Sequence, residues 1–284
     1  MSRQVERRKG RLDLGTQELE FACYEVRPGS APVIVLLHEG LGSVSLWKAF
    51  PAKLAAATGE NVAVYSRAGY GESTPVELPR PLDYMQREAV DVLPRVLDQL
   101  GFERGVLLGH SDGASIAAYY AGSVPDRRVR GLVLFAPHFF VEEMTVAEIA
   151  RTRERWQTTD LRMRLGRHHH DVDNAFLGWN GAWLDPEFRK WETTECLAYI
   201  RVPVLVVQGA ADPYGTLAQV RAMERECICP LETVVLPGVG HSPQFEAPEA
   251  TLEVTSAFVR HLLELDASPG ARGREPALAS GGRR

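Results

Sequence analysis

The sequence predicts an α/β domain whose central sheet is mostly parallel and is covered by helices on both faces. The main observation is a series of short, branched, apolar runs, each typical of a strand buried on both sides. Stretches with apolar residues at helical spacing lie between several of these runs. The expected strands are residues 32–37, 61–65, 105–108, 129–135, 202–208 and 231–236.

Helices and edge strands complete this pattern. Pro94 is expected to kink one of the helices, because proline has no N–H to donate to the preceding turn. Residues 12–14 and 18–26 alternate between apolar and polar side chains and predict a hairpin at the edge of the sheet. The expected helices are residues 46–58, 83–100, 217–226 and about 247–265.

Composition excludes several classes of function. The chain has 284 residues, of which 45% are hydrophobic and 24% charged, and its formal net charge is −5. This balance argues against nucleic acid or an anionic membrane as a partner, and no apolar run is long enough to cross a bilayer. The charged start of the chain and the four cysteines, which lack zinc-ligand spacing, favour a reducing, cytoplasmic setting.

The chain is organised around residues 109–113, with the sequence Gly-His-Ser-Asp-Gly. They follow a predicted strand and precede an alanine-rich predicted helix, which is the setting of a nucleophile elbow. In such a turn the serine adopts a strained backbone conformation, and the two glycines leave room for the chain that crosses it. The alternative is an ordinary strand–turn–helix joint in which Ser111 only caps the helix.

Several motifs in the same order as the elbow resemble those of the α/β-hydrolase superfamily, over roughly residues 12–264. The motifs are residues 36–43 (Leu-Leu-His-Glu-Gly-Leu-Gly-Ser), 65–73 (Tyr-Ser-Arg-Ala-Gly-Tyr-Gly-Glu-Ser), the elbow itself, 208–212 (Gln-Gly-Ala-Ala-Asp) and 238–241 (Gly-Val-Gly-His). The resemblance implies the α/β-hydrolase fold with a helical cap inserted after a central strand. After residue 140 the sequence becomes polar and aromatic, and it includes four of the five tryptophans. We therefore expect a core of residues 11–136 and 201–265, a cap of residues 137–200, and flexible termini of residues 1–10 and 266–284.

The resemblance also implies a catalytic triad in the order serine, acid, histidine. Ser111, Asp212 and His241 fit this order, and each follows a predicted strand. His241 would act as the base and Asp212 would orient it, with Glu142 as the alternative acid. The alternatives without function are an Asp-Pro turn at Asp212 and a simple loop histidine at residue 241.

The segment that begins at His38 supplies one oxyanion-hole amide in the resembling family. Glu39 replaces the usual first glycine, so we assign this role to the Gly40 amide, with Leu41 as the alternative, and the second amide to Asp112. Glu39 is interpreted as a solvated loop acid or as a carboxylate that points into the pocket. The Asp112 side chain is expected to cap the following helix.

The substrate pocket is expected beneath the cap, where tryptophans would form an apolar wall unless they only hold the cap together. The run of residues 168–171 (His-His-His-Asp) is interpreted as solvated, since adjacent side chains on a helix diverge and cannot converge on a metal. No metal and no cofactor are expected. The pocket candidates are Glu39, Leu41, His138, Phe139, Trp179 and Trp183.

Together these features predict a serine hydrolase that cleaves an ester or thioester of a small, largely apolar acyl substrate through an acyl-enzyme. One alternative is a carbon–carbon bond hydrolase of a vinylogous diketone, which would use the same triad. Another is a hydrolase fold that only binds a ligand, because fold alone does not give function. The expected partner is a small molecule, and a homo-oligomer stays open.

Overall fold

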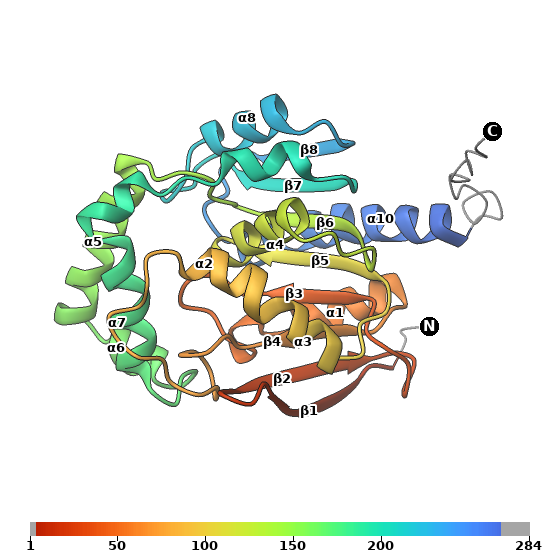
Figure 1. Ribbon diagram of the computed structural model, residues 1–284, viewed down its shortest axis with the longest axis horizontal. Helices are drawn as coiled ribbons and strands as arrows, with labels where there is room; N and C mark the ends of the chain where they lie inside the picture. The colour runs from red at the N-terminus through yellow and green to blue at the C-terminus, as the bar shows by residue number, and fades with distance from the viewer. Residues whose placement is uncertain (1–3, 268–284) are drawn as a thin grey trace, which may run out of the picture.

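The computed structural model describes residues 4–267 and contains one eight-stranded sheet with the order β1-β2-β4-β3-β5-β6-β7-β8 (Figure 1). Strands β3 to β8 run parallel to one another, and β2 is antiparallel to both of its neighbours. The mostly parallel sheet predicted from the sequence is confirmed. The strands are β1 (Glu6–Asp13), β2 (Glu18–Glu25), β3 (Ile34–Leu37), β4 (Val62–Tyr65), β5 (Gly105–His110), β6 (Val129–Phe135), β7 (Val204–Gly209) and β8 (Leu231–Leu236).

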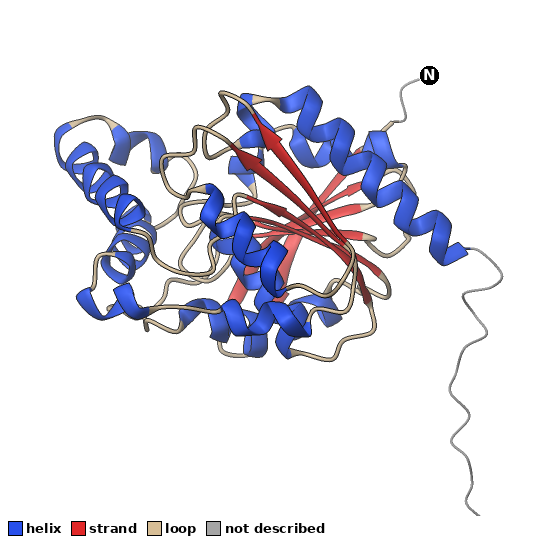
Figure 2. Ribbon diagram, turned by 90° about the horizontal axis from the view of Figure 1, so that it is seen from above, coloured by secondary structure: helices blue, strands red, loops and turns tan. Residues whose placement is uncertain are grey.

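Helices cover both faces of this sheet (Figure 2). Successive residues of β3 belong to different cores: Ile34 and Leu36 pack with α1 and α10, whereas Val35 and Leu37 pack with α3 and α4. This is why the central strands are apolar at every position rather than at every second one. The helices of the core are α1 (Phe50–Thr58), α2 (Tyr84–Arg87), α3 (Leu93–Gln99), α4 (Asp112–Ser123), α8 (Leu217–Glu226), α9 (Pro243–Glu246) and α10 (Pro248–Ala267).

Residues 137–200, all of which are described, contribute no strand to the sheet. Their helices α5, α6 and α7 lie together at one side of it (Figure 1). Two short 3₁₀ helices lead the chain back to β7. The bounds are α5 (Glu143–Thr158), α6 (Leu161–Leu165), α7 (Val172–Trp183), and the 3₁₀ helices Pro186–Lys190 and Thr194–Tyr199.

One local expectation was wrong. Residues 6–10 were expected to fray, but they form part of β1, which pairs with β2 along its whole length. The helix expected over residues 83–100 is present without a break from Tyr84 to Gln99, but it is irregular: α2 is followed by a π-helical segment (Glu88–Val92) and then by α3. Pro94, in the first turn of α3, cannot donate to a carbonyl in the preceding turn, so a regular α-helix does not continue through it.

The structure describes only the first two residues of the predicted flexible C-terminal segment, residues 266–284. Residues 266 and 267, which were placed in the flexible tail, belong to α10. The rest of that segment, residues 268–284, lies outside the described residues. Between residues 4 and 267, no helix combines the length and the apolar character that a bilayer crossing requires.

The turn between β5 and α4 is built by a close approach of backbones. Ser111 has φ 53° and ψ −119°, a conformation that L-residues rarely adopt. A Cβ on Gly113 would lie 2.1 Å from the Leu37 carbonyl oxygen, and one on Gly109 would lie 2.3 Å from the Gly113 carbonyl oxygen. Only glycine therefore fits at both positions, as expected for a nucleophile elbow.

Gly113→Ala should consequently lower the free energy of unfolding by about 2 kcal/mol or more, because the new methyl group would meet backbone atoms that cannot move independently. Gly181→Ala is the matched control. Gly181 is exposed within α7, and no described atom outside its own helix lies within 4 Å of the position of a new Cβ. This variant should be more stable than the wild type by about 0.5–1 kcal/mol. Urea unfolding measures both values, and a Gly113→Ala protein as stable as the wild type would contradict this account of the turn.

Candidate active site

Ser111 lies where β5 ends and α4 begins, with its side chain at the carboxyl edge of the parallel sheet. The Ser111 carbonyl accepts hydrogen bonds from the amides of Ala114 and Ser115, so the residue is fixed to the first turn of the helix. The residue is buried, at 7% exposure, and it lines a cavity beneath α5 and α7. Its hydroxyl is thus held at the edge where open α/β sheets bind ligands.

The structure brings Asp212 and His241 to this hydroxyl. His241 Nε2 lies 3.0 Å from Ser111 Oγ, and His241 Nδ1 lies 2.8 Å from Asp212 Oδ2. Asp212 follows β7 and His241 follows β8, so three strand ends deliver the three side chains. The sequence prediction that these residues converge agrees with this geometry. Glu142, the alternative acid, instead accepts hydrogen bonds from Thr216 and Gln219.

Asp212 is held as a carboxylate. Burial alone would raise its pKa, but the hydrogen bond and positive potential of His241 and a hydrogen bond from the Tyr214 amide lower the pKa to about 2. Gln208 Nε2 also donates to Asp212 Oδ2, at 2.9 Å. A carboxylate at this place fixes the tautomer with the proton on His241 Nδ1, which leaves Nε2 free to accept a proton from Ser111.

Residues that the sequence did not single out hold the His241 loop. His110 Nε2 lies 2.8 Å from the His241 carbonyl oxygen, so the residue before Ser111 also contacts the loop of His241. The Glu246 carboxylate accepts hydrogen bonds from the amides of Gly240 and Ser242, at 2.7 and 2.9 Å. The His110 contact joins residues more than one hundred positions apart, so no local sequence pattern identifies it.

Arg67 organises the loop that follows β3. Its guanidinium is fully buried and donates to the carbonyl oxygens of His38 and Glu39, at 2.5 and 3.1 Å. The N–H of a trans peptide points away from the C=O of the same unit, so binding the Glu39 carbonyl turns the Gly40 N–H away from Arg67. Gly40 lines the cavity, and its N–H has no hydrogen-bond partner among the described residues.

The cap contributes a second anchor to this loop. His169 is buried, and its Nδ1 accepts the Gly71 amide while its Nε2 contacts the Leu41 carbonyl oxygen, both at 3.0 Å. The expectation of a solvated histidine run was therefore wrong for His169, because it connects the cap to two core loops. Burial lowers its pKa to about 4, which keeps the ring neutral. No group of three or more side chains within residues 4–267 is arranged to hold a metal.

Asp112 was expected to cap α4 with its side chain, and this was wrong. Its carboxylate makes no capping hydrogen bond and instead accepts one from the Tyr84 hydroxyl, at 2.5 Å, with Arg67 Nη2 4.0 Å away. Burial raises the pKa of Asp112, and the neighbouring Arg67 charge opposes that rise. The Asp112 amide, at the N-terminus of α4, has no hydrogen-bond acceptor among the described residues and borders the same cavity as Gly40.

The cavity above Ser111 has a volume of about 190 Å³. Five of the six pocket candidates line it: Glu39, Leu41, His138, Trp179 and Trp183. The Glu39 side chain is 27% exposed and its Oε2 lies 3.6 Å from His110 Nδ1, so it faces the site rather than bulk solvent. Sequence reasoning missed five further side chains that line it: His110, Thr145, Ile149, Tyr214 and Ser242.

Phe139 is a correction. It is fully buried and packs in the core between the sheet and the cap, and it does not line the cavity. Its amide donates to Gln219 and its carbonyl accepts from Thr193, which fixes the chain where it enters the cap. Other aromatic rings of the cap pack on one another, as Trp156 does on Phe176 at 3.9 Å between ring centroids.

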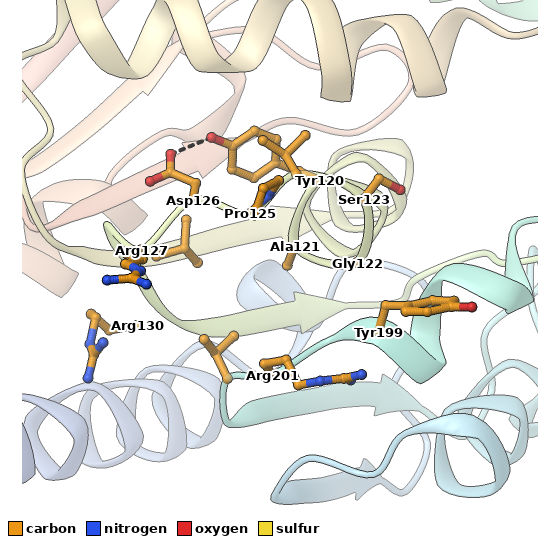
Figure 3. A pocket seen from close by; sticks show the side chains of 13 residues that line it. Tyr120, Ala121, Gly122, Ser123, Pro125, Asp126, Arg127, Arg130, Tyr199 and Arg201 are labelled. Carbon is orange, nitrogen blue, oxygen red and sulfur yellow. Dashed lines mark hydrogen bonds between the residues drawn. The ribbon is translucent and has the colours of Figure 1, made fainter. Parts of the chain in front are cut away.

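A larger cavity of about 470 Å³ lies at the other end of the sheet, near the start of β6 (Figure 3). Tyr120, Arg127, Tyr199 and Arg201 are among the side chains that line it. The Tyr120 hydroxyl there donates to Asp126, and the cavity contains none of the three residues of the proposed triad. Its size therefore does not make it the site of chemistry.

Comparison with known proteins agrees with this fold. The sequence model of the alpha/beta hydrolase family matches residues 34–254. The chain is 27% identical to epoxide hydrolase A of Mycobacterium tuberculosis, over 88% of this chain and 96% of that protein. It is 26% identical to the bifunctional esterase/perhydrolase DCH of Acinetobacter calcoaceticus, over 82% and 93% of the two chains.

A solved structure gives the same result for the fold. The enol-lactonase from Burkholderia xenovorans LB400 superposes with a TM-score of 0.67 at 22% identity, covering 88% of this chain and 99% of that chain. The family match spans most of the sheet and includes the positions of Ser111, Asp212 and His241. The chain is therefore a member of the alpha/beta hydrolase family and an enzyme of the hydrolase class.

Proposed function

We propose that this enzyme hydrolyses esters or thioesters of small acyl groups through a covalent acyl-enzyme on Ser111. The observation that carries the proposal is the continuous hydrogen-bonded series Asp212–His241–Ser111 at the floor of the cavity, with distances of 2.8 and 3.0 Å. A serine hydroxyl is a weak nucleophile at neutral pH and reacts only when a base within hydrogen-bond reach removes its proton. His241 meets that requirement, and Asp212 stabilises the imidazolium that forms.

The first half of the reaction transfers the acyl group. Ser111 Oγ attacks the carbonyl carbon while its proton passes to His241 Nε2, and the carbonyl oxygen becomes an oxyanion that the amides of Gly40 and Asp112 would bind. The intermediate collapses when His241 gives the proton to the leaving oxygen or sulfur. Water then attacks the acyl-enzyme with the same base, and the acid and Ser111 are released.

The nucleophile favours an acyl substrate over an epoxide, although one relative is named an epoxide hydrolase. A serine oxygen that opened an epoxide would form an ether, which has no carbonyl for water to attack, and the enzyme would remain alkylated. An acyl-serine keeps its carbonyl and turns over. The esterase and enol-lactonase relatives, by their names, act on this class of bond.

Cavity size and lining support a small, largely apolar acyl group. The cavity volume of about 190 Å³ lies below the roughly 300–1,000 Å³ typical of drug-sized ligand sites. Ile149, Trp179 and Trp183 of the cap supply the apolar wall. The proposal places this reaction in the cytoplasm with a small-molecule substrate; all four cysteines are free, as a reducing compartment would keep them.

A substrate panel tests the function directly. p-Nitrophenyl esters from acetate to octanoate, matching acyl-coenzyme A thioesters and a vinylogous diketone should show highest kcat/KM for the short esters or thioesters, because long chains exceed the cavity. Turnover of the diketone alone would establish the carbon–carbon alternative in place of the proposal. A protein that cleaves none of them and does not react with a fluorophosphonate would not be a serine hydrolase.

Ser111→Ala should lower kcat by about 10⁴-fold or more while the protein stays folded, because only the hydroxyl is lost. Steady-state kinetics and fluorophosphonate labelling measure this, with no label expected on the variant. The matched control is Ser256→Ala, in α10 and remote from the cavity, which should be labelled and active like the wild type. Retained turnover in Ser111→Ala would rule out this serine as the nucleophile.

Asp212→Asn should lower kcat by about 10³- to 10⁴-fold with little change in KM, since the amide favours the wrong tautomer of His241. Steady-state kinetics measure both constants.

The free energy of unfolding should also depend on pH through Asp212. The Asp212 pKa of about 2 is lower than in the unfolded chain, so this carboxylate stabilises the fold above about pH 4 and the stabilisation is lost as the pH falls toward 2. Urea unfolding at several pH values should give a wild-type advantage over the variant of about 2 kcal/mol at pH 6, which shrinks toward pH 2. An advantage that does not depend on pH would show that the Asp212 pKa is not lowered.

A further inference from the structure

His138 is a buried, titratable residue of the site that the proposed mechanism does not use. It follows β6, is 2% exposed and lines the cavity. Its ring centroid lies 5.7 Å from that of His241 and 5.5 Å from that of Trp183. The side chain therefore stands next to the reacting groups without contributing to the triad.

The backbone of His138 is fixed relative to the nucleophile. Ser115 Oγ donates to the His138 carbonyl at 2.6 Å and accepts from the His138 amide at 3.2 Å. Ser115 lies one helical turn after Ser111 in α4, and its own amide donates to the Ser111 carbonyl. The ring thus projects from a rigid position rather than from a mobile loop.

The two ring nitrogens of His138 have different surroundings. Nδ1 is enclosed and has no hydrogen-bond partner among the described residues, and Gly215 lies against that edge. Burial, together with the neighbouring His241, lowers the pKa of His138 to about 3, so the ring is neutral and carries one proton. An orphaned N–H in the interior is rarer than an orphaned acceptor, which places the proton on Nε2, the edge that faces the cavity.

Strand order shows on which side of Ser111 this N–H lies. β5 lies between β3 and β6, so Ser111 is flanked by the Gly40 loop on one side and by His138 on the other. The oxyanion amides hold the carbonyl oxygen on the β3 side. His138 therefore lies on the opposite, β6 side of Ser111, where its ring borders the cavity that would hold the acyl chain. The hydroxyls of Thr145 and Tyr214 are already occupied, since Thr145 donates to the Tyr214 carbonyl and Tyr214 pairs with Thr152.

We propose that His138 Nε2–H donates a hydrogen bond to a second oxygen on the acyl chain, so that the enzyme prefers oxo- or alkoxy-acyl esters over plain alkanoyl esters. This inference rests on the proposed esterase function and narrows its substrate class. His138 would act as a specificity-determining residue, and no proton transfer to or from it is required.

Matched substrates measure this preference. The pairs are the p-nitrophenyl esters of 3-oxobutanoate and butanoate, and of 4-oxopentanoate and pentanoate, which differ by one keto oxygen. The quantity compared is the ratio of kcat/KM for the oxo ester to that for the plain ester, in the wild type and in each variant. Because the same two substrates are used throughout, their intrinsic reactivities cancel between proteins.

His138→Phe keeps a ring but removes the donor, and it should lower this ratio about five- to tenfold for at least one pair. His138→Gln restores a donor near Nε2 and should recover most of the ratio. Thr145→Val is the matched control on the same cavity and should leave the ratio within about twofold of the wild type. Ratios unchanged in His138→Phe for both pairs would overturn the proposal, as would a loss in His138→Phe that His138→Gln does not repair.

A binding measurement separates this inference from the proposed function. In a Ser111→Ala background, titration of each ester gives dissociation constants without turnover, and adding His138→Phe should weaken binding of the oxo ester about five- to tenfold more than binding of the plain ester. If the wild type cleaves no ester, the proposed function fails. The ratio of the dissociation constants of the oxo ester and the plain ester still decides the role of His138. Equal weakening of both esters would contradict that role.

Discussion

The site depends on one imidazole that must contact two side chains at once. His241 contacts Ser111 through one ring nitrogen and Asp212 through the other, at 3.0 and 2.8 Å, and these residues lie 130 and 29 positions away in the sequence. A parallel sheet satisfies this constraint because the loops after β5, β7 and β8 all leave the same edge. His110 and Glu246 hydrogen-bond to the backbone of residues 240–242, so the position of the His241 ring depends on both of these side chains.

Buried charge beside the proposed oxyanion amides has to be compensated. The Asp112 carboxylate lies next to the nucleophile, where an uncompensated negative charge would oppose a developing oxyanion. Tyr84 donates to this carboxylate, and the Arg67 guanidinium lies 4.0 Å from it. The same guanidinium binds the carbonyl oxygens of His38 and Glu39. One buried cation therefore both compensates the Asp112 charge and turns the Gly40 amide away from itself.

Much of this architecture could be predicted from the sequence because it depends on local pattern. Apolar runs fixed the positions of β3 to β8, and the glycines around Ser111 indicated a turn that tolerates no Cβ. Features set by contacts between distant segments could not be predicted. Three features depend on how the cap and the core meet: the hydrogen bond between buried His169 and Gly71, the Tyr84 partner of Asp112, and the position of Phe139 outside the cavity. Residues 6–10 also look like a frayed, charged terminus until β2 supplies their hydrogen-bond partners.

Intact-protein mass spectrometry of a quenched reaction with a slowly hydrolysed p-nitrophenyl ester tests the central claim most directly. The account predicts a transient mass increase equal to one acyl group, located on Ser111 by peptide mapping, that appears with the burst of p-nitrophenol and decays as the acid is released. Turnover without any acyl adduct, or an adduct on a different residue, would contradict it.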